Sequence, residues 1–213
     1  MLRPYYIEHI LEAGCDEAGR GPLAGSVFAA AVILPMDIDK LACEGLVERL
    51  NDSKQLSAKQ RYELRPLIEK YALAFAVAQV TPEEIDQINI LNASILGMHR
   101  ALAQLNIVPA HILVDGNKWR PYVPQNECLE IPAQTIVKGD GKYLSIAAAS
   151  ILAKTYRDDY MLELHEMYPN YHWDKNMGYP TKEHYQAIQQ FGITPYHRKT
   201  FKLLKNNGNH CEK

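Results

Sequence analysis

The chain has 213 residues, which suits one large domain or one domain with a small appendage. Hydrophobic residues make up 47% and charged residues 23%, a balance that excludes a disordered or low-complexity chain. The formal net charge is −2, so the charge gives no sign of nucleic-acid binding. A protein of this charge that binds nucleic acid must gather its basic residues on one face.

No segment of the sequence predicts a membrane anchor or a secreted protein. The longest apolar runs, residues 27–34 and 72–78, are far shorter than the roughly 20 residues of a membrane helix. The first twelve residues carry charges and no long apolar stretch, which argues against a signal peptide. The cysteines are widely spaced and form no CxxC motif, so we expect buried or partly buried thiols in a reducing, cytoplasmic compartment: Cys15, Cys43, Cys128 and Cys211.

The first half of the chain predicts a hairpin and then a helix. Residues 10–16 and 26–34 are apolar runs on either side of a glycine-rich loop, which is typical of a β-hairpin. Ser57 and Gln60 have the spacing of a capping box, so a helix is expected to start at Ala58. Pro66 lies within this helix and predicts a kink or an early end.

Alternating strands and helices are predicted through the middle of the chain. Residues 72–80 favour a strand, and Thr81 with Glu84 has the spacing of a second helix cap. An amphipathic helix is indicated by apolar residues at steps of 4, 3, 4 and 3: Leu91, Ile95, Met98, Leu102 and Leu105. Residues 111–116 predict a buried strand, and residues 130–137, with Pro132 near the start, predict a strand at the sheet edge.

The last part of the chain is predicted to be helical. A long helix is expected over residues 143–166 and a shorter one over residues 181–191, with a frayed tail from residue 206. This order of elements predicts a mixed α/β sheet with a helical C-terminal region. We expect residues 1–213 to form one domain, with residues 170–205 as its C-terminal appendage.

Carboxylates follow three of the predicted strands. Asp16 and Glu17, Asp115, and Asp140 lie at strand ends, where sites form in open α/β sheets. Gathering like charges is costly, and a divalent cation with hard oxygen ligands, Mg²⁺ or Mn²⁺, removes that cost. Such sites often hold two metals and act on phosphates. Taken singly, each carboxylate is better explained as a turn or cap residue.

The neighbouring pair Asp16 and Glu17 poses a geometric problem. In a regular strand these two side chains point to opposite faces. We therefore expect a bend at Glu17, next to the glycine-rich loop, to turn both carboxylates into one site.

Seven segments of the chain, in order, carry a family resemblance. The segment CDEAGRGPLAG at residues 15–25 resembles the opening motif of type 2 ribonucleases H, specifically bacterial ribonuclease HII. Further segments resemble later motifs of that family in the same order: residues 51–57, 113–116, 138–140, 145–158, 178–184 and 197–201. The resemblance covers about residues 8–201.

This resemblance implies a fold and an activity. The implied fold is ribonuclease H-like: a mixed five-stranded sheet flanked by helices, with a helical C-terminal part. The implied reaction is metal-dependent hydrolysis of the RNA strand of RNA–DNA hybrids, and incision on the 5′ side of single ribonucleotides in duplex DNA. The products would carry 5′-phosphate and 3′-hydroxyl ends.

The resemblance also implies roles for individual residues. Catalytic and Mn²⁺- or Mg²⁺-binding roles fall on Asp16, Glu17, Asp115 and Asp140, and some members have a further acidic residue at the position of Asp158. Substrate-binding roles fall on Gly19, Arg20, Gly21, Lys54 and Tyr179, with Arg198 and Lys199 as further basic candidates. Glycines let backbone approach a 2′-hydroxyl, and basic side chains contact phosphates without reading sequence.

Other interpretations remain open from the sequence. Lys154 and Asp158 have the spacing of a simple helix ion pair. Trp119 and Arg120 lie in a loop where both could contact substrate. For Trp119 the alternative is that it covers the core.

Alternatives also exist for the whole chain. A ribonuclease HIII-like specificity usually comes with an extra N-terminal domain, for which the start of the motif at Asp16 leaves no room. A non-catalytic hybrid binder would lack some of the four carboxylates, and an ATPase would need a GxxxxGK[ST] loop. We expect a monomer whose partner is nucleic acid and not a membrane.

Overall fold

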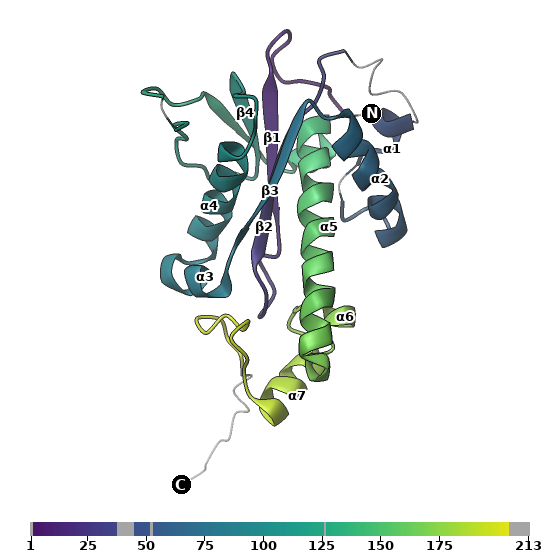
Figure 1. Ribbon diagram of the computed structural model, residues 1–213, viewed down its shortest axis with the longest axis vertical. Coiled ribbons are helices and arrows are strands. Elements are labelled where there is room, and N and C mark those ends of the chain that lie inside the picture. The colour runs from purple at the N-terminus through teal and green to yellow at the C-terminus, as the bar shows by residue number, and fades with distance from the viewer. Residues whose placement is uncertain (1, 38–44, 52, 126, 205–213) are drawn as a thin grey trace.

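The computed structural model describes residues 2–37, 45–51, 53–125 and 127–204 (Figure 1). Its centre is a five-stranded sheet in the order β3-β2-β1-β4-β5. The strands are β1 (Glu12–Ala18), β2 (Val27–Ile33), β3 (Ala74–Val80), β4 (His111–Asp115) and β5 (Ala133–Ile136). The first three pair antiparallel, whereas β4 runs parallel to β1 and β5 runs parallel to β4. The expectations of a hairpin, a mixed sheet and an edge strand at β5 are confirmed.

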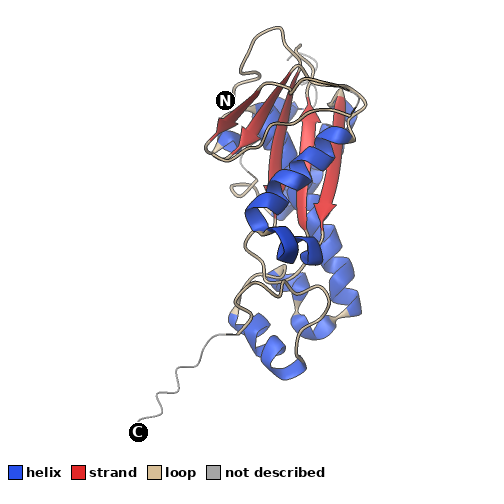
Figure 2. Cartoon of the chain, turned by 90° about the vertical axis from the view of Figure 1, so that its left-hand side faces the viewer, coloured by secondary structure: helices blue, strands red, loops and turns tan. Residues whose placement is uncertain are grey.

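Helices cover both faces of the sheet (Figures 1 and 2). Alternate residues of β2 face the two layers: Ala30 and Val32 pack on the side of α5 (Leu144–Met167). Ala29 and Ala31 pack on the side of α4 (Ile90–Ala103). The α5 layer also contains α1 (Leu46–Arg49) and α2 (Ala58–Tyr71), and the α4 layer contains α3 (Pro82–Ile88).

Small residues let α5 lie directly on the central strand. Gly14 of β1 is so close to the start of α5 that a Cβ built there would lie 2.3 Å from the carbonyl carbon of Ser145. Ala147, Ala148 and Ala149 on α5 are fully buried against the sheet. This close contact fixes where the later residues of α5 meet the end of β1.

The capping signals predicted from the sequence are present, but α2 does not end early. Ser57 and Gln60 form both bonds of a capping box at the start of α2. The helix nevertheless continues past Pro66 to Tyr71, so the predicted early end is wrong. Pro66 is exposed, so water can bond the carbonyl that loses its donor, while Leu64 and Ile68 hold the opposite face in the core.

The C-terminal region forms its own small core beyond the end of the sheet (Figure 2). It contains η4 (Pro169–Tyr171), α6 (Trp173–Asn176) and α7 (Lys182–Phe191), gathered around the fully buried Trp173. The chain then returns to the β1–β2 hairpin, where Gly25 N–H donates to the carbonyl of Tyr196 at 2.9 Å. The helical region is thereby joined to the loop that precedes β2.

Two of the cysteine expectations can be examined. Cys15 is buried as expected, but Cys128 is exposed, because it lies on the surface connection between β4 and β5. Cys43, Cys211, Asp52, Lys205 and the tail from residue 206 lie outside the described residues. Within the part of the chain that is described, none of the helices combines the length and apolar character needed to cross a membrane.

Candidate active site

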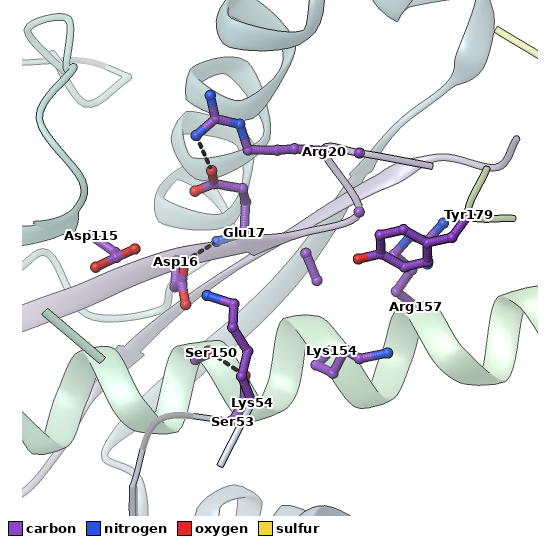
Figure 3. Close-up of a pocket in the computed structure, with 13 residues that line it drawn as sticks. Asp16, Glu17, Arg20, Ser53, Lys54, Asp115, Ser150, Lys154, Arg157 and Tyr179 are labelled. Atoms are coloured by element: carbon purple, nitrogen blue, oxygen red, sulfur yellow. Dashed lines mark hydrogen bonds and ion pairs between the residues drawn. The ribbon is translucent and has the colours of Figure 1, made fainter. Parts of the chain in front are cut away.

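A cleft of about 250 Å³ opens where β1 continues beyond its pairing with β4 (Figure 3). The parallel ladder ends at Cys15 and Val114, and the next residues of the two strands are Asp16 and Asp115. The residues that line the cleft come from the end of β1, its following loop, the segment before α2, the end of β4, α5 and the loop before α7: Asp16, Glu17, Ala18, Gly19, Arg20, Gly21, Ser53, Lys54, Asp115, Ser150, Lys154, Arg157 and Tyr179.

Asp16 and Glu17 reach the cleft without the bend that the sequence led us to expect. β1 stays in one-to-one register with β2 through Ala18, and Glu17 pairs with Ala29. The two side chains therefore leave opposite faces of the strand, as Figure 3 shows. Both line the cleft because the β1–β4 ladder has already ended at Cys15 and Val114, which leaves this edge of β1 open to either face.

Asp115 and Asp140 are held by backbone donors. Oδ1 of Asp115 accepts a hydrogen bond of 2.7 Å from the N–H of Gly139, at the start of the short helix η3 (Gly139–Gly141). Asp140 lies in η3, is buried, and accepts from the N–H of Gly141 at 3.0 Å. Asp140 is joined to the cleft through Lys54, whose Nζ lies 3.8 Å from Oδ2, although it is not itself a lining residue.

The carboxylates repel one another in a setting with little water. Burial raises the pKa of Asp16 well above its usual range, and the charges of Glu17 and Asp115 raise it further. Burial also raises the pKa of Glu17, although Arg20 opposes the shift. Carboxylates that raise one another's pKa in this way fit a divalent cation with oxygen ligands.

Cationic side chains stand among these carboxylates. Nη1 of Arg20 lies 3.2 Å from Oε1 of Glu17, and both Arg20 and Lys54 have exposed side chains. Among the described residues, no three carboxylate, histidine or cysteine side chains are already grouped closely enough to surround one ion. Asp158 is buried and forms the expected helix ion pair with Lys154, so it faces Lys154 rather than lining the cleft.

Tyr179 and the loop after β1 form one wall of the cleft (Figure 3). Gly19 has φ +94°, a conformation that glycine adopts without strain. A Cβ built on Gly21 would lie 3.5 Å from Cε1 of Tyr179, so the ring rests against the backbone of this loop. The tyrosine side chain is still 42% exposed and available for a ligand.

A buried histidine pair holds the backbone of Tyr179. Nε1 of Trp173 can only donate, and it lies 3.1 Å from Nε2 of His184. His184 therefore carries its proton on Nδ1, which donates to the carbonyl of Tyr179 at 2.9 Å. Nε2 of His197 must then donate to His184, at 3.2 Å, while its Nδ1 accepts from the N–H of Thr194. Nε2 of His184 thus accepts from both Trp173 and His197, and each of the other ring nitrogens is either a donor or an acceptor.

The remaining predicted residues lie away from the cleft lining. Arg198 is fully buried and its donors go to backbone carbonyls, so it has no surface to offer a phosphate. Lys199 is exposed, and its backbone N–H donates to the carboxylate of Asp86. Trp119 packs against the core and against His99, which favours the core interpretation for that residue, while Arg120 is exposed.

The structure adds three polar lining residues to which the sequence gave no role. Ser53 and Ser150 hydrogen bond through their hydroxyls at 2.8 Å, and Ser150 also bonds to Asp16. Arg157 is 1% exposed and reaches the loop after β1. All three lie within motifs quoted above, so the signal was present in the sequence, but only tertiary contacts show what they touch.

Solved structures of type 2 ribonucleases H share this fold. The ribonuclease H2 of Pyrococcus horikoshii superposes with a TM-score of 0.72 at 29% identity, over 90% of this chain and 94% of that chain. Bst-RNase HIII in complex with Mn²⁺ superposes with a TM-score of 0.67 at 18% identity, over 93% of this chain and 69% of that chain. The fold therefore places the chain among ribonuclease H-type proteins.

Sequence comparisons identify the family. The family model for ribonuclease HII matches residues 13–204. The ribonuclease HII of Phocaeicola vulgatus is 63% identical over 96% of this chain and 95% of its own length. The chain belongs to the ribonuclease HII family, whose members are endoribonucleases that degrade RNA in RNA–DNA hybrids.

Proposed function

We propose that this protein incises duplex DNA on the 5′ side of a single embedded ribonucleotide, in addition to cutting longer RNA–DNA hybrids. The products would be 5′-phosphate and 3′-hydroxyl ends. The observation that carries this proposal is one cleft in which Asp16, Glu17 and Asp115 lie beside the Gly19–Arg20–Gly21 backbone and the exposed ring of Tyr179. The same cleft therefore holds the carboxylates proposed for the reaction and the backbone and ring proposed to contact one sugar.

The proposed cofactor is Mn²⁺ or Mg²⁺, in a two-metal site, held by Asp16, Glu17, Asp115 and Asp140. When bound, such ions activate water and stabilise the leaving oxygen. Burial and the charges of neighbouring carboxylates raise the pKa values of Asp16 and Glu17, and this repulsion fits the proposed donor chemistry. Asp158 could bind a metal ion only after breaking its ion pair with Lys154, so we assign it the weaker role of neutralising the charge of that lysine.

Recognition of the ribonucleotide would use backbone and an aromatic ring. The Gly19–Gly21 backbone would approach the 2′-hydroxyl, which separates RNA from DNA, and Tyr179 would pack against the neighbouring sugar. Arg20 and Lys54, long cationic side chains at the rim, would contact phosphates and so position the duplex without reading its sequence.

The decisive experiment is cleavage of a DNA duplex that holds one ribonucleotide, with Mn²⁺, Mg²⁺ or EDTA, followed by mapping of the cut. The expected result is metal-dependent incision 5′ of the ribonucleotide, with an all-DNA duplex left intact. Cleavage of a long hybrid alone would point to a ribonuclease HIII-like specificity. Binding without cleavage of either substrate would favour a non-catalytic binder.

The setting of the protein is also part of the proposal. We propose a cytoplasmic monomer that folds as one domain with its C-terminal helical appendage. Light scattering after size-exclusion chromatography tests the monomer, and a dimer at micromolar concentration would contradict it.

A further inference from the structure

Arg198 is fully buried directly behind the Gly19–Gly25 loop. Its guanidinium donates to the carbonyls of Gly19 at 2.7 Å, Arg20 at 3.0 Å and Gly25 at 2.8 Å. Its own N–H donates to the carbonyl of Leu23 at 2.8 Å. One residue from the C-terminal region therefore bonds four carbonyls of the loop that follows β1.

Arg157 of α5 reaches the same loop from the other side. Its Nε donates to the carbonyl of Ser26 at 3.2 Å, and Nη2 donates to those of Ala24 at 3.3 Å and Met177 at 3.1 Å. Met177 stands two residues before Tyr179. The Arg157 side chain thus connects the glycine loop with the segment that carries the tyrosine, and it packs so closely on Gly19 that a Cβ there would lie 2.1 Å from Nε.

The guanidinium groups of Arg157 and Arg198 hydrogen bond to backbone carbonyls and not to any carboxylate that the structure describes. Within the described ranges, neither arginine forms an ion pair with a carboxylate. Burial, together with the charge of Arg157, lowers the pKa of Arg198 to about 9, so the group still carries its charge at neutral pH. Burying two charges is costly, and here hydrogen bonds to backbone carbonyls offset that cost.

The bonds to Arg198 also orient the other side of the loop. In a trans peptide, the carbonyl of one residue and the N–H of the next point in opposite directions. Since the carbonyls of Gly19 and Arg20 face Arg198, the N–H groups of Arg20 and Gly21 face away from it. No described residue accepts a hydrogen bond from either N–H, and both residues line the cleft.

We propose that Arg198 and Arg157 are positioning residues that turn the N–H groups of Arg20 and Gly21 toward the cleft and hold Tyr179 at a fixed place beside them. This inference rests on the proposed recognition of the ribonucleotide at that wall. Arg198 contributes to selection of the 2′-hydroxyl by acting through the loop and does not itself contact phosphate. Arginine suits this role because its planar fork offers several donors in fixed directions, whereas lysine offers one ammonium group.

The test compares Arg198→Lys and Arg157→Lys, each in an Asp115→Asn background that prevents cleavage. A labelled duplex with one ribonucleotide is competed with an identical all-DNA duplex, which gives the ratio of the two affinities. This ratio does not depend on how much of a preparation is folded, because the same folded molecules bind both duplexes. Arg100→Lys, at an arginine paired with Glu84 outside the cleft, is the matched control.

The parent protein, which carries Asp115→Asn alone, is expected to prefer the ribonucleotide duplex. Each arginine variant should lose about tenfold of that preference, because this is the effect of one misplaced hydrogen bond. Affinity for the all-DNA duplex and the preference of Arg100→Lys should stay within about twofold. A parent without any preference would contradict the proposed function. A parent with a preference that both variants retain would overturn the role given to the arginines.

Discussion

The buried pair His184 and His197 predicts how the stability of the protein depends on pH. Burial, together with the charge of His184, lowers the pKa of His197 to about 4, and burial also lowers the pKa of His184. Protonation would give Nδ1 of His197 a hydrogen where it now accepts from Thr194. The unfolded chain takes up this proton near pH 6.5, so lowering the pH favours the unfolded state.

The size of the effect follows from the two pKa values of His197. Between pH 7.5 and pH 5.5, a folded pKa of about 4 against an unfolded value near 6.5 lowers the free energy of unfolding by about 1.3 kcal/mol. His197 is 1% exposed, so solvent screening reduces this little. Urea unfolding at the two pH values should show the midpoint falling by about 0.5 M.

Two variants separate this pair from the other titrating groups. His197→Gln should remove about 1.3 kcal/mol of the difference in stability between the two pH values, whatever its stability at pH 7.5. His9→Asn, which replaces an exposed histidine, is the control variant. If His197→Gln kept the full loss on acidification, the reasoning from the buried pair would be refuted.

Three further predictions concern the cleft and the packing beneath it. Asp115→Asn should lower single-turnover cleavage at least about 100-fold while hybrid binding, measured by fluorescence anisotropy, is largely kept; undiminished turnover would remove Asp115 from the site. Tyr179→Ala should reduce incision at a single ribonucleotide, yet change the free energy of unfolding by less than about 0.5 kcal/mol because the ring is 42% exposed. An unchanged ratio of single-ribonucleotide to long-hybrid cleavage would count against its role at the sugar. Gly14→Ala should lower the free energy of unfolding by about 1–3 kcal/mol, because its Cβ would lie 2.3 Å from Ser145 backbone, and a urea midpoint equal to that of wild type would contradict this packing.

Local patterns in the sequence were sufficient for most of the secondary structure. The caps at Ser57 and Thr81 and the buried apolar positions Ile95, Met98 and Leu102 act over three or four residues and appear as predicted. The two outer positions of the predicted apolar face differ, because Leu91 is exposed and Leu105 lies beyond the end of α4 at Ala103. The early end predicted at Pro66 was wrong because the local cost of the proline is offset by burial of Leu64 and Ile68, which are contacts made with distant residues.

The carboxylate cluster was only partly predictable. Strand ends and family motifs pointed to Asp16, Glu17, Asp115 and Asp140, and the structure brings the first three into one cleft, with Asp140 joined through Lys54. The way in which Asp16 and Glu17 share that cleft was not predictable. It depends on where the ladder between β1 and β4 ends, which is a property of the whole sheet.

The sequence by itself determined the family, the order of strands and helices, and the set of chemically capable residues, because these follow from motifs and from local periodicity. Only the tertiary structure decided what the basic residues do. Arg198 and Lys199 are adjacent and look alike in the sequence, yet one is buried behind the glycine loop and the other is exposed. Burial and hydrogen-bond partners depend on residues more than 100 positions away, as the bonds from Arg198 to Gly19 and Gly25 show.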